Sequence, residues 1–290
     1  MRLLMLRTIL VATDLTPASA KAIDTARRLA EASGAKLRVV HVRVPAAFGE
    51  ARIDADDLAR QAGLTPGKRL VDILSGDPAA EISTLANGIG ADLIVLGHHR
   101  ESGRPEGAPV GSTAYAVITR TEAPCLVVSR PLDLPLRRAL VATDFSEAAR
   151  GALLAALSWT SALRSRAPAH PEPMLVALHV ESSPLDANCV NQDSEELTRE
   201  LESLKRSAGE WSGVQVHGLT RSGTDPARCI VECAREEGVE LVVMGTHART
   251  TGRRTGLGSI SDAVIRAQDI PVLLVPPAVW RDYARDLDAA

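Results

Sequence analysis

The stretch at residues 241–261 is LVVMGTHARTTGRRTGLGSIS, an apolar run that continues into a glycine-rich, basic loop. The run from Leu241 to Met244 is typical of a strand covered on both faces. From Gly245 to Ser259 the loop has no carboxylate, and it carries glycines at 245, 252, 256 and 258 and arginines at 249, 253 and 254. Glycines let backbone N–H groups approach an anion, and a helix that begins at Gly258-Ser259 directs more N–H groups to the same place. The stretch therefore indicates a phosphate-binding loop, and the alternative is a solvated loop in which Ser259 caps a helix.

A second copy of this pattern lies earlier in the chain, within a repeat that spans most of it. Asp92-Leu-Ile-Val-Leu-Gly97 matches Glu240-Leu-Val-Val-Met-Gly245, and Ile9-Leu-Val-Ala-Thr-Asp14 matches Ala139-Leu-Val-Ala-Thr-Asp144. Further matches follow in the same order, such as Gly111-Ser112 with Gly258-Ser259. The repeat predicts one domain at 1–131, a second at 137–277 and a C-terminal tail at 278–290.

Within each domain, strand patterns alternate with helix patterns. The first domain has predicted helices near 17–33, 50–62, 78–90 and 111–122, and predicted strands near 8–13, 36–42, 69–74, 92–97 and 125–129. The second domain has predicted strands near 138–143, 174–180, 214–220, 240–244 and 272–275. The predicted fold class is therefore α/β, with two tandem open parallel five-stranded sheets flanked by helices.

Composition argues against several classes of partner. The chain has 290 residues, 45% of them hydrophobic, which is enough for two buried cores. The formal net charge is −3 and aromatic residues make up only 2%, so neither a basic surface nor a stacking platform for nucleic acid is expected. Arg7 and Asp14 interrupt the apolar N-terminus, which argues against a signal peptide, and no apolar run is long enough for a membrane span.

Cysteine usage points to a reducing compartment, and we expect a cytoplasmic protein. The four cysteines form no CxxC pair and are too few for a disulfide framework. Cys229 and Cys233 lie four residues apart on a predicted helix. This spacing could supply half of a metal site. The favoured interpretation is that both are small residues on a buried helix face, so no metal site is predicted.

The ends of two predicted strands suggest where a ligand binds. In an open parallel sheet, ligands sit at the carboxyl ends of strands where the strand order reverses. Asp144 follows the first strand of the second domain and Gly245 ends its fourth, so a reversal between these strands places both at one crevice. A carboxylate opposite a basic glycine loop suits a nucleotide. The alternative for Asp144 is a cap on the helix that begins near Glu147.

These motifs resemble those of the universal stress protein family. Val141-Ala-Thr-Asp144 resembles its first-strand motif, Leu178-His179-Val180 its second, and Gly245-Thr-His-Ala248 followed by nine residues and Gly258-Ser259 its ATP loop. The chain has Ala248 where the family has a second glycine. The resemblance implies a Rossmann-like fold of the adenine nucleotide α-hydrolase type that binds ATP, with or without Mg²⁺. It also implies nucleotide contacts at Ala142, Asp144, Val180, Gly245, Thr246, His247, Ala248, Arg249, Gly258, Ser259 and Ile260.

The first domain matches the family loop less well. Arg100 replaces the second glycine, ten residues separate it from Gly111, and Glu101 and Glu106 place negative charge where phosphates would lie. We therefore predict a weak or lost site in this domain. Its residues would be Asp14, Val42, Gly97, Gly111 and Ser112.

Three functions are compatible with the sequence. The first is an ATP-binding regulatory or stress-response protein, the second a slow ATP hydrolase or other ATP-using enzyme, and the third a nucleotide-independent interaction scaffold. Gly63-Leu-Thr-Pro-Gly67-Lys68 is too short for a Walker A motif, and His247 is more easily explained by loop packing or phosphate contact than as a base. We therefore predict adenine nucleotide as partner and no catalytic residue.

The fifth strands of the two domains are expected to associate. Single-domain relatives commonly pair through this strand, and here it is apolar and bracketed by prolines in both domains. The resemblance thus implies that the two domains pair within one chain, and the intact chain could still form a homodimer.

Overall fold

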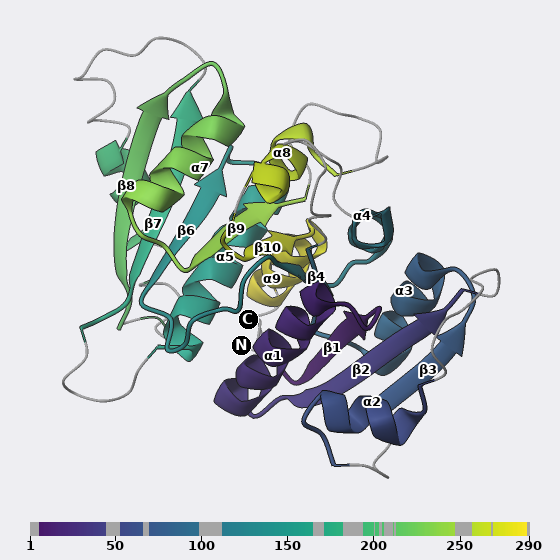
Figure 1. Cartoon of the computed structure of the whole chain (residues 1–290). Coiled ribbons are helices and arrows are strands. Elements are labelled where there is room, and N and C mark those ends of the chain that lie inside the picture. Colours follow the sequence, from purple (N-terminus) through teal and green to yellow (C-terminus); the bar gives the residue numbers. More distant parts are fainter. Residues whose placement is uncertain are drawn as a thin grey trace. The chain divides into compact units, whose positions relative to one another are not determined.

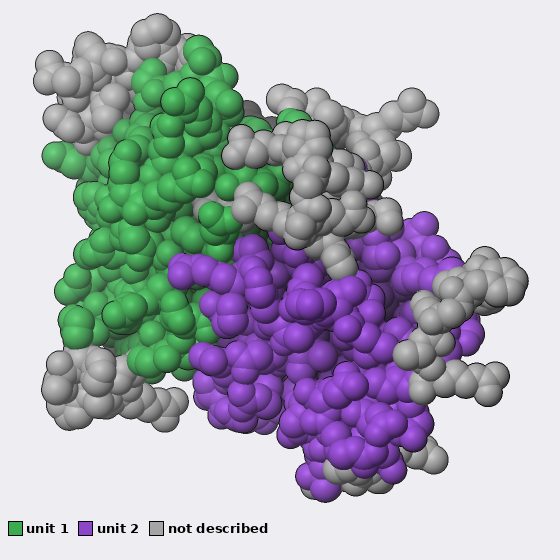
Figure 2. Space-filling view, in the orientation of Figure 1, with its two compact units in different colours: residues 1–4, 132–290 green, residues 5–131 purple. Residues whose placement is uncertain are grey.

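The fold is described from a computed structural model. The structure describes residues 6–44, 53–65, 70–98, 112–164, 171–181, 194–199, 201–202, 205, 211, 213–246, 257–267 and 269–288. Two compact units divide the chain and are coloured separately in Figure 2. We refer to Met5–Pro131 as the N-terminal domain (purple) and to Leu132–Ala290 as the C-terminal domain (green).

The N-terminal domain is a parallel sheet with the strand order β3-β2-β1-β4-β5. Helices α3 and α4 contact each other, and right-handed crossovers place them on the face opposite α1. Its strands are β1 (Thr8–Thr13), β2 (Lys36–Arg43), β3 (Val71–Ser75), β4 (Leu93–Gly97) and β5 (Cys125–Val128), and its helices are α1 (Pro17–Ser33), α2 (Ala55–Gln61), α3 (Pro78–Ile89) and α4 (Ser112–Arg120).

The C-terminal domain repeats this architecture, with the order β10-β9-β6-β7-β8 and an additional last helix (Figure 1). The strand order reverses between β6 and β9, as the sequence analysis assumed. Its strands are β6 (Arg138–Thr143), β7 (Met174–Glu181), β8 (Gln215–Ser222), β9 (Leu241–Gly245) and β10 (Val272–Val275), and its labelled helices are α5 (Glu147–Ala162), α7 (Pro226–Glu236), α8 (Ser259–Ala267) and α9 (Ala278–Asp288).

The α/β fold class is confirmed, and local sequence explains the element boundaries. Pro17 and Pro78 stand at the first turns of α1 and α3, where a missing N–H costs nothing. Gly34 ends α1 with φ of 74°, which a residue with a side chain would rarely adopt. The central strands are fully buried: every residue from Leu93 to Leu96 and from Leu241 to Met244 is in the core. In the described part of the chain, every helix is too short or too polar to span a bilayer.

One acidic residue in each domain fixes the start of the first strand. In the C-terminal domain, the Glu240 carboxylate accepts hydrogen bonds from the backbone N–H groups of Arg137 (2.6 Å) and Arg138 (3.3 Å) and from Arg137 Nε (2.7 Å). In the N-terminal domain, Asp92 accepts from the N–H groups of Arg7 (3.0 Å) and Thr8 (2.8 Å). In each domain, the acidic residue before the fourth strand therefore accepts hydrogen bonds from backbone N–H groups at the start of the first strand.

Because Glu240 is only 6% exposed, its removal leaves these donors without an acceptor. We expect Glu240→Ala to lower the free energy of unfolding by about 2 kcal/mol. Asp282→Ala is the matched control, since that side chain is 63% exposed and pairs with Arg285 on the same exposed side of α9, so a change below about 0.5 kcal/mol is expected. Urea unfolding of both variants measures the difference, and equal effects would show that Glu240 has no such role.

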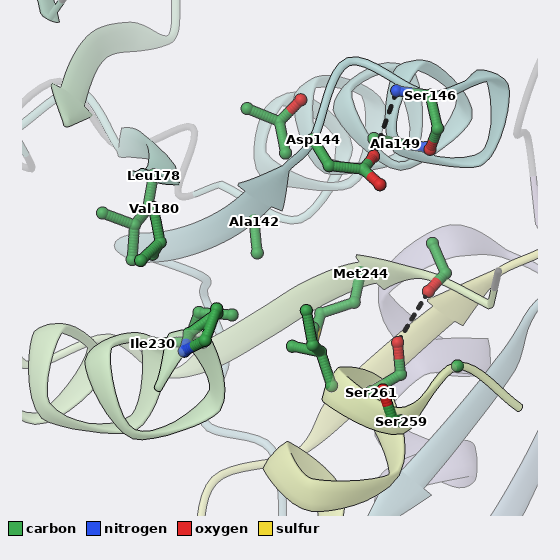
Figure 3. A pocket seen from close by; sticks show the side chains of 15 residues that line it. Ala142, Asp144, Ser146, Ala149, Leu178, Val180, Ile230, Met244, Ser259 and Ser261 are labelled. Carbon is green, nitrogen blue, oxygen red and sulfur yellow. Dashed lines mark hydrogen bonds between the residues drawn. The ribbon is translucent and has the colours of Figure 1, made fainter. Parts of the chain in front are cut away.

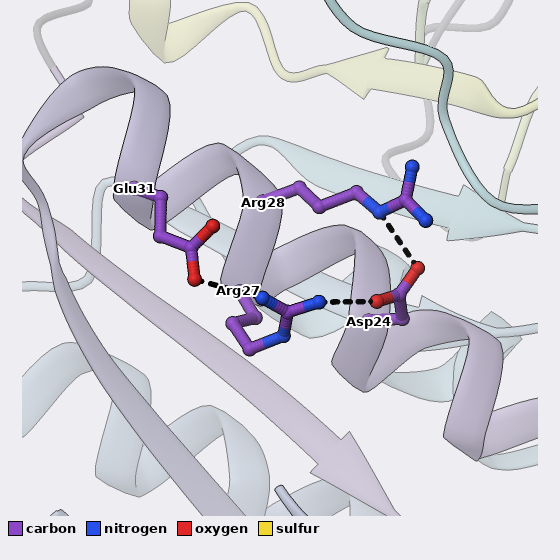
Figure 4. Close-up of polar contacts among 4 residues, drawn as sticks. All are labelled: Asp24, Arg27, Arg28 and Glu31. Atoms are coloured by element: carbon purple, nitrogen blue, oxygen red, sulfur yellow. Dashed lines mark hydrogen bonds and ion pairs between the residues drawn. The ribbon is translucent and has the colours of Figure 1, made fainter. Parts of the chain in front are cut away.

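The outer faces of the equivalent helices α1 and α5 differ. Helix α1 exposes a network in which Asp24 pairs with Arg27 and Arg28 and Arg27 also pairs with Glu31, each at 2.8 Å (Figure 4). Helix α5 has no such network among its described residues, and it is buried almost throughout from Ala148 to Thr160. A helix that is apolar around its circumference needs cover on its outer side.

Helix α9 supplies that cover. It packs against α5 within the C-terminal domain, and a side chain at Gly151 would lie 3.3 Å from the Trp280 backbone nitrogen. Val279 and Tyr283 are 8% and 3% exposed, and the Arg150 guanidinium lies 5.5 Å from the centre of the Trp280 ring. The segment predicted only as a tail therefore contributes a helix to the core.

Candidate functional site

The carboxyl ends of β6, β7 and β9 surround a pocket in the C-terminal domain. The pairing of β6 with β9 ends at Val141 and Val243, so the residues that follow each strand diverge at the point of reversal. The cavity has a volume of about 270 Å³. It is lined by Ala142, Thr143, Asp144, Ser146, Ala149, Leu178, Val180, Pro226, Ile230, Met244, Gly245, Gly258, Ser259, Ile260 and Ser261.

Polar and apolar groups occupy different parts of the pocket wall (Figure 3). Asp144, from the turn before α5, lies on one side, and Ser259, at the start of α8, lies on the opposite side. Ala142 and Met244 lie between them, and Val180 and Ile230 form a further apolar wall. Asp144 is the one carboxylate among the described lining residues. The pocket can therefore hold a flat apolar group beside a carboxylate, with an anion at the helix start.

A tight turn sets the position of Asp144. Thr143 Oγ1 accepts from Phe145 N (3.1 Å), Asp144 Oδ1 accepts from Ser146 N (3.0 Å), and Phe145 has φ of 60°. Ser146, not Asp144, is the N-cap of α5, since its side chain accepts from Ala149 N at 3.2 Å. The interpretation of Asp144 as the helix cap is therefore wrong.

His179 supports the same turn from the neighbouring strand. Its Nδ1 lies 2.9 Å from the Thr143 carbonyl oxygen, which can only accept, so Nδ1 carries the proton. The ring packs against Phe145 with centroids 4.9 Å apart, and Nε2 lies 3.5 Å from the Glu181 carboxylate. His41 makes the equivalent 2.9 Å contact with Thr13 in the N-terminal domain. Both domains therefore hold the end of their first strand in the same way.

The backbone of Val180 faces the pocket side of the sheet. The Glu181 carbonyl accepts from Gly223 N on the β8 side at 3.0 Å. Because backbone groups of successive strand residues point to opposite sides, those of Val180 point toward β6. The β6 ladder ends opposite His179, at Thr143, so Val180 lies beside the space beyond that strand.

Gly245 has a packing role that the sequence analysis missed. A Cβ at this position would lie 2.7 Å from Ala148 Cβ and 2.8 Å from the Ala148 carbonyl carbon, in the first turn of α5. A Cβ at Gly97 would likewise lie 3.0 Å from backbone atoms of Ala18 and Ser19. The strand-end glycine therefore lets a helix approach the sheet in both domains, whether or not an anion is bound nearby.

The start of α8 also differs in detail from the prediction. Asp262 N donates to the Gly258 carbonyl (2.9 Å), so Gly258 occupies the cap position and Ser259 is the first helical residue. The interpretation of Ser259 as the cap is therefore wrong. Gly258 N donates to the Thr246 carbonyl at 2.9 Å, and the next N–H groups, at Ser259 and Ile260, are in the first turn of α8, where no preceding helical carbonyl is available to accept them.

The structure brings most of the predicted site residues together. The pocket is lined by Ala142, Asp144, Val180, Gly245, Gly258, Ser259 and Ile260. Thr246 is 3% exposed and lies beside it. In the N-terminal domain, Asp14 follows β1, Val42 is the next-to-last residue of β2, Gly97 ends β4 and Ser112 begins α4. His247, Ala248, Arg249 and Gly111 lie outside the described residues.

Sequence reasoning missed several lining residues. They come from the turn before α5 and the start of that helix, from β7 and β9, and from α7 and α8, and only the three-dimensional fold brings them to the pocket. The missed residues are Thr143, Ser146, Ala149, Leu178, Pro226, Ile230, Met244 and Ser261. Thr143, Leu178, Met244 and Ser261 lay within the motifs already noted, so their places beside the predicted site residues were the available signal.

The cysteines on α7 are not a reactive pair. Cys233 is buried, and burial raises the pKa of its thiol to about 11, while Cys229 is half-buried. Burial likewise raises the pKa of the Cys125 thiol in the N-terminal domain. Within the described ranges, no three His, Cys, Asp or Glu side chains gather as metal ligands would.

Comparison with known proteins gives the family. The model of the universal stress protein family matches residues 5–129 and again residues 135–276. The chain belongs to the universal stress protein family. Helix α9 of this universal stress protein lies beyond the second matched region, which ends at 276.

Curated relatives are similar over part of the chain. Universal stress protein MJ0531 of Methanocaldococcus jannaschii is 41% identical over 81 residues, which is 28% of this chain and 46% of the relative. Universal stress protein MJ0577 of the same organism is 34% identical over 85 residues, which is 29% of this chain and 51% of the relative. The matched stretches thus span about half the length of these relatives.

Solved structures of similar fold cover nearly the whole chain. A universal stress protein from Archaeoglobus fulgidus has a TM-score of 0.68 at 21% identity and covers 93% of this chain and 98% of its own. A putative universal stress protein from Pseudomonas aeruginosa has a TM-score of 0.63 at 18% identity and covers 99% of both chains. At these identities the likeness establishes the tandem fold.

Proposed function

We propose that this universal stress protein binds an adenine nucleotide, ATP with or without Mg²⁺, in the pocket of its C-terminal domain, and serves a regulatory or stress-response role. The observation that carries the proposal is the pocket itself. It combines a carboxylate, an apolar wall and a helix start at the strand reversal, where nucleotides bind in sheets of this type.

The parts of a nucleotide fit the parts of the wall. The base lies against Ala142, Val180 and Met244, where the backbone of Val180 can meet its polar edge. The Asp144 carboxylate accepts hydrogen bonds from ribose hydroxyls. The phosphates lie at the start of α8, where the N–H groups of Ser259 and Ile260 and the exposed Ser259 hydroxyl are donors. The volume, about 270 Å³, is close to the lower end of small-molecule sites, roughly 300 Å³, and suits the nucleoside.

We expect one nucleotide per chain. The strand ends of the N-terminal domain correspond to those around the C-terminal pocket, with Asp14 and Gly97 in place of Asp144 and Gly245. The difference lies in the loop sequences of the N-terminal domain, where Glu101 and Glu106 would repel a polyphosphate and the long side chain of Arg100 would obstruct its approach to the backbone.

Calorimetric titration with ATP tests the proposal. Saturable binding with one site per chain is expected, weakened about tenfold by Asp144→Ala and left unchanged by the matched Asp14→Ala. Absence of heat and of protection against thermal unfolding would favour a nucleotide-independent scaffold, and multiple turnover would favour an enzyme. Two equivalent sites would contradict the assignment to one domain.

The remaining sequence expectations stay predictions. They are pairing of the two domains through their fifth strands and a cytoplasmic location inferred from the cysteine content.

A further inference from the structure

The hydroxyl of Ser261 connects the start of α8 to the end of β9. Its Oγ lies 2.9 Å from the Gly245 carbonyl oxygen, and the side chain is 5% exposed (Figure 3). A carbonyl oxygen can only accept, so the hydroxyl is the donor. We propose that Ser261 is a positioning residue that holds the helix start in place for the nucleotide; this inference rests on the proposed function.

Ser261 lines the pocket, but it is not suited to bind phosphate directly. A serine hydroxyl has one proton, and Ser261 already donates it to the carbonyl oxygen of Gly245. An ionised phosphate offers only acceptors, and the remaining lone pairs of the hydroxyl would repel it. The residue therefore acts through the segment that it tethers, whereas Ser259, with an exposed side chain, is placed to contact the ligand.

The tether completes a short series of hydrogen bonds from the sheet to the helix. Thr246 N donates to the Val275 carbonyl (3.0 Å), which joins the end of β9 to β10, and Gly258 N donates to the Thr246 carbonyl (2.9 Å). Ser261 adds a second connection, one turn further along α8. With both connections made, the N–H groups of Ser259 and Ile260 are fixed relative to β9 before a ligand arrives, which lowers the ordering cost of binding.

The N-terminal domain provides an internal comparison. Gly111-Ser112 corresponds to Gly258-Ser259, and Ala114 therefore occupies the position of Ser261. Alanine has no hydroxyl, so this tether cannot form in that domain. Ala114 is 6% exposed at the equivalent place in α4, which shows that the fold accommodates alanine there.

The test combines ATP binding with amide hydrogen exchange of the full chain. We expect Ser261→Ala to weaken ATP binding about three- to tenfold and to speed exchange at 257–261 in the unliganded protein, while the chain stays folded with a modestly lower melting temperature. Ser261→Thr keeps the hydroxyl and should restore both. Ser261→Cys, of similar size but a weak donor, should resemble alanine. Ser83→Ala is the control, because that hydroxyl is buried without a hydrogen-bond partner among the described residues, and no change is expected.

The outcomes separate this inference from the proposed function. If Ser261→Ala binds ATP with the same affinity as the wild type and its amides at 257–261 exchange at the wild-type rate, the inference alone is overturned. Loss of affinity in both Ser261→Ala and Ser261→Thr would also overturn it, because the hydroxyl would then not be the cause. A wild-type chain that binds no ATP would overturn the proposed function, and the inference with it.

Discussion

The double variant Gly258→Val, Ser259→Ala is expected to abolish nucleotide binding while the chain stays folded. Valine at the cap position of α8 blocks the approach of a phosphate to the N–H groups of Ser259 and Ile260, and alanine removes the exposed hydroxyl. We expect at least a 100-fold loss of ATP affinity, which corresponds to about 3 kcal/mol. Calorimetry measures the affinity and circular dichroism the folded state.

The repeat supplies the control for this experiment. The double variant Gly111→Val, Ser112→Ala makes the same change at the equivalent helix start of the N-terminal domain. It should leave the ATP affinity within about a factor of two of the wild-type value. A folded double variant at 258 and 259 that binds ATP like wild type would contradict the phosphate assignment. The same loss of affinity in the control variant would instead show that the nucleotide binds in the N-terminal domain.

Removing helix α9 is expected to destabilise the C-terminal domain strongly. A chain that ends after Pro277 loses Val279 and Tyr283 from the core and exposes the apolar outer face of α5. Burial of two such side chains is worth about 3–6 kcal/mol, so we expect a markedly lower midpoint in urea and self-association through the uncovered face.

A single and a double variant separate the loss of packing from the loss of chain length. Tyr283→Ala should account for about 3 kcal/mol of the effect, because the ring is buried. Asp282→Ala, Arg285→Ala changes only the exposed side of α9, where the side chains are 63% and 76% exposed, and should have little effect. If the truncated chain unfolds at the wild-type midpoint and remains monodisperse in sedimentation, α9 is not part of the core.

The sequence was sufficient for the architecture because buried parallel strands have a strong local signature. The apolar runs that end at Gly97 and Gly245 and the prolines at 17 and 78 predict element positions from neighbouring residues alone. The repeat then predicts the topology, since two collinear copies require two similar folds. Asp144 and Gly245 could be assigned to one crevice by the strand-reversal rule, without any knowledge of side-chain positions.

Features that depend on packing between distant segments could not be predicted. Gly245 was interpreted as an anion contact, although its missing side chain is also required by Ala148 in a different element. The donor role of Gly258 N and the tether from Ser261 to Gly245 depend on how α8 approaches β9. Helix α9 was assigned to a tail because its amphipathic pattern has meaning only beside the uncovered face of α5.

Photoaffinity labelling with 8-azido-ATP tests whether the nucleotide lies in the C-terminal pocket. The azide is on the base, so the reacted peptides identify the residues around it. We expect saturable labelling that excess ATP prevents, confined to peptides that contain Ala142, Val180 or Met244. Saturable labelling of the equivalent N-terminal strands, or labelling that excess ATP does not prevent, would contradict binding in this pocket.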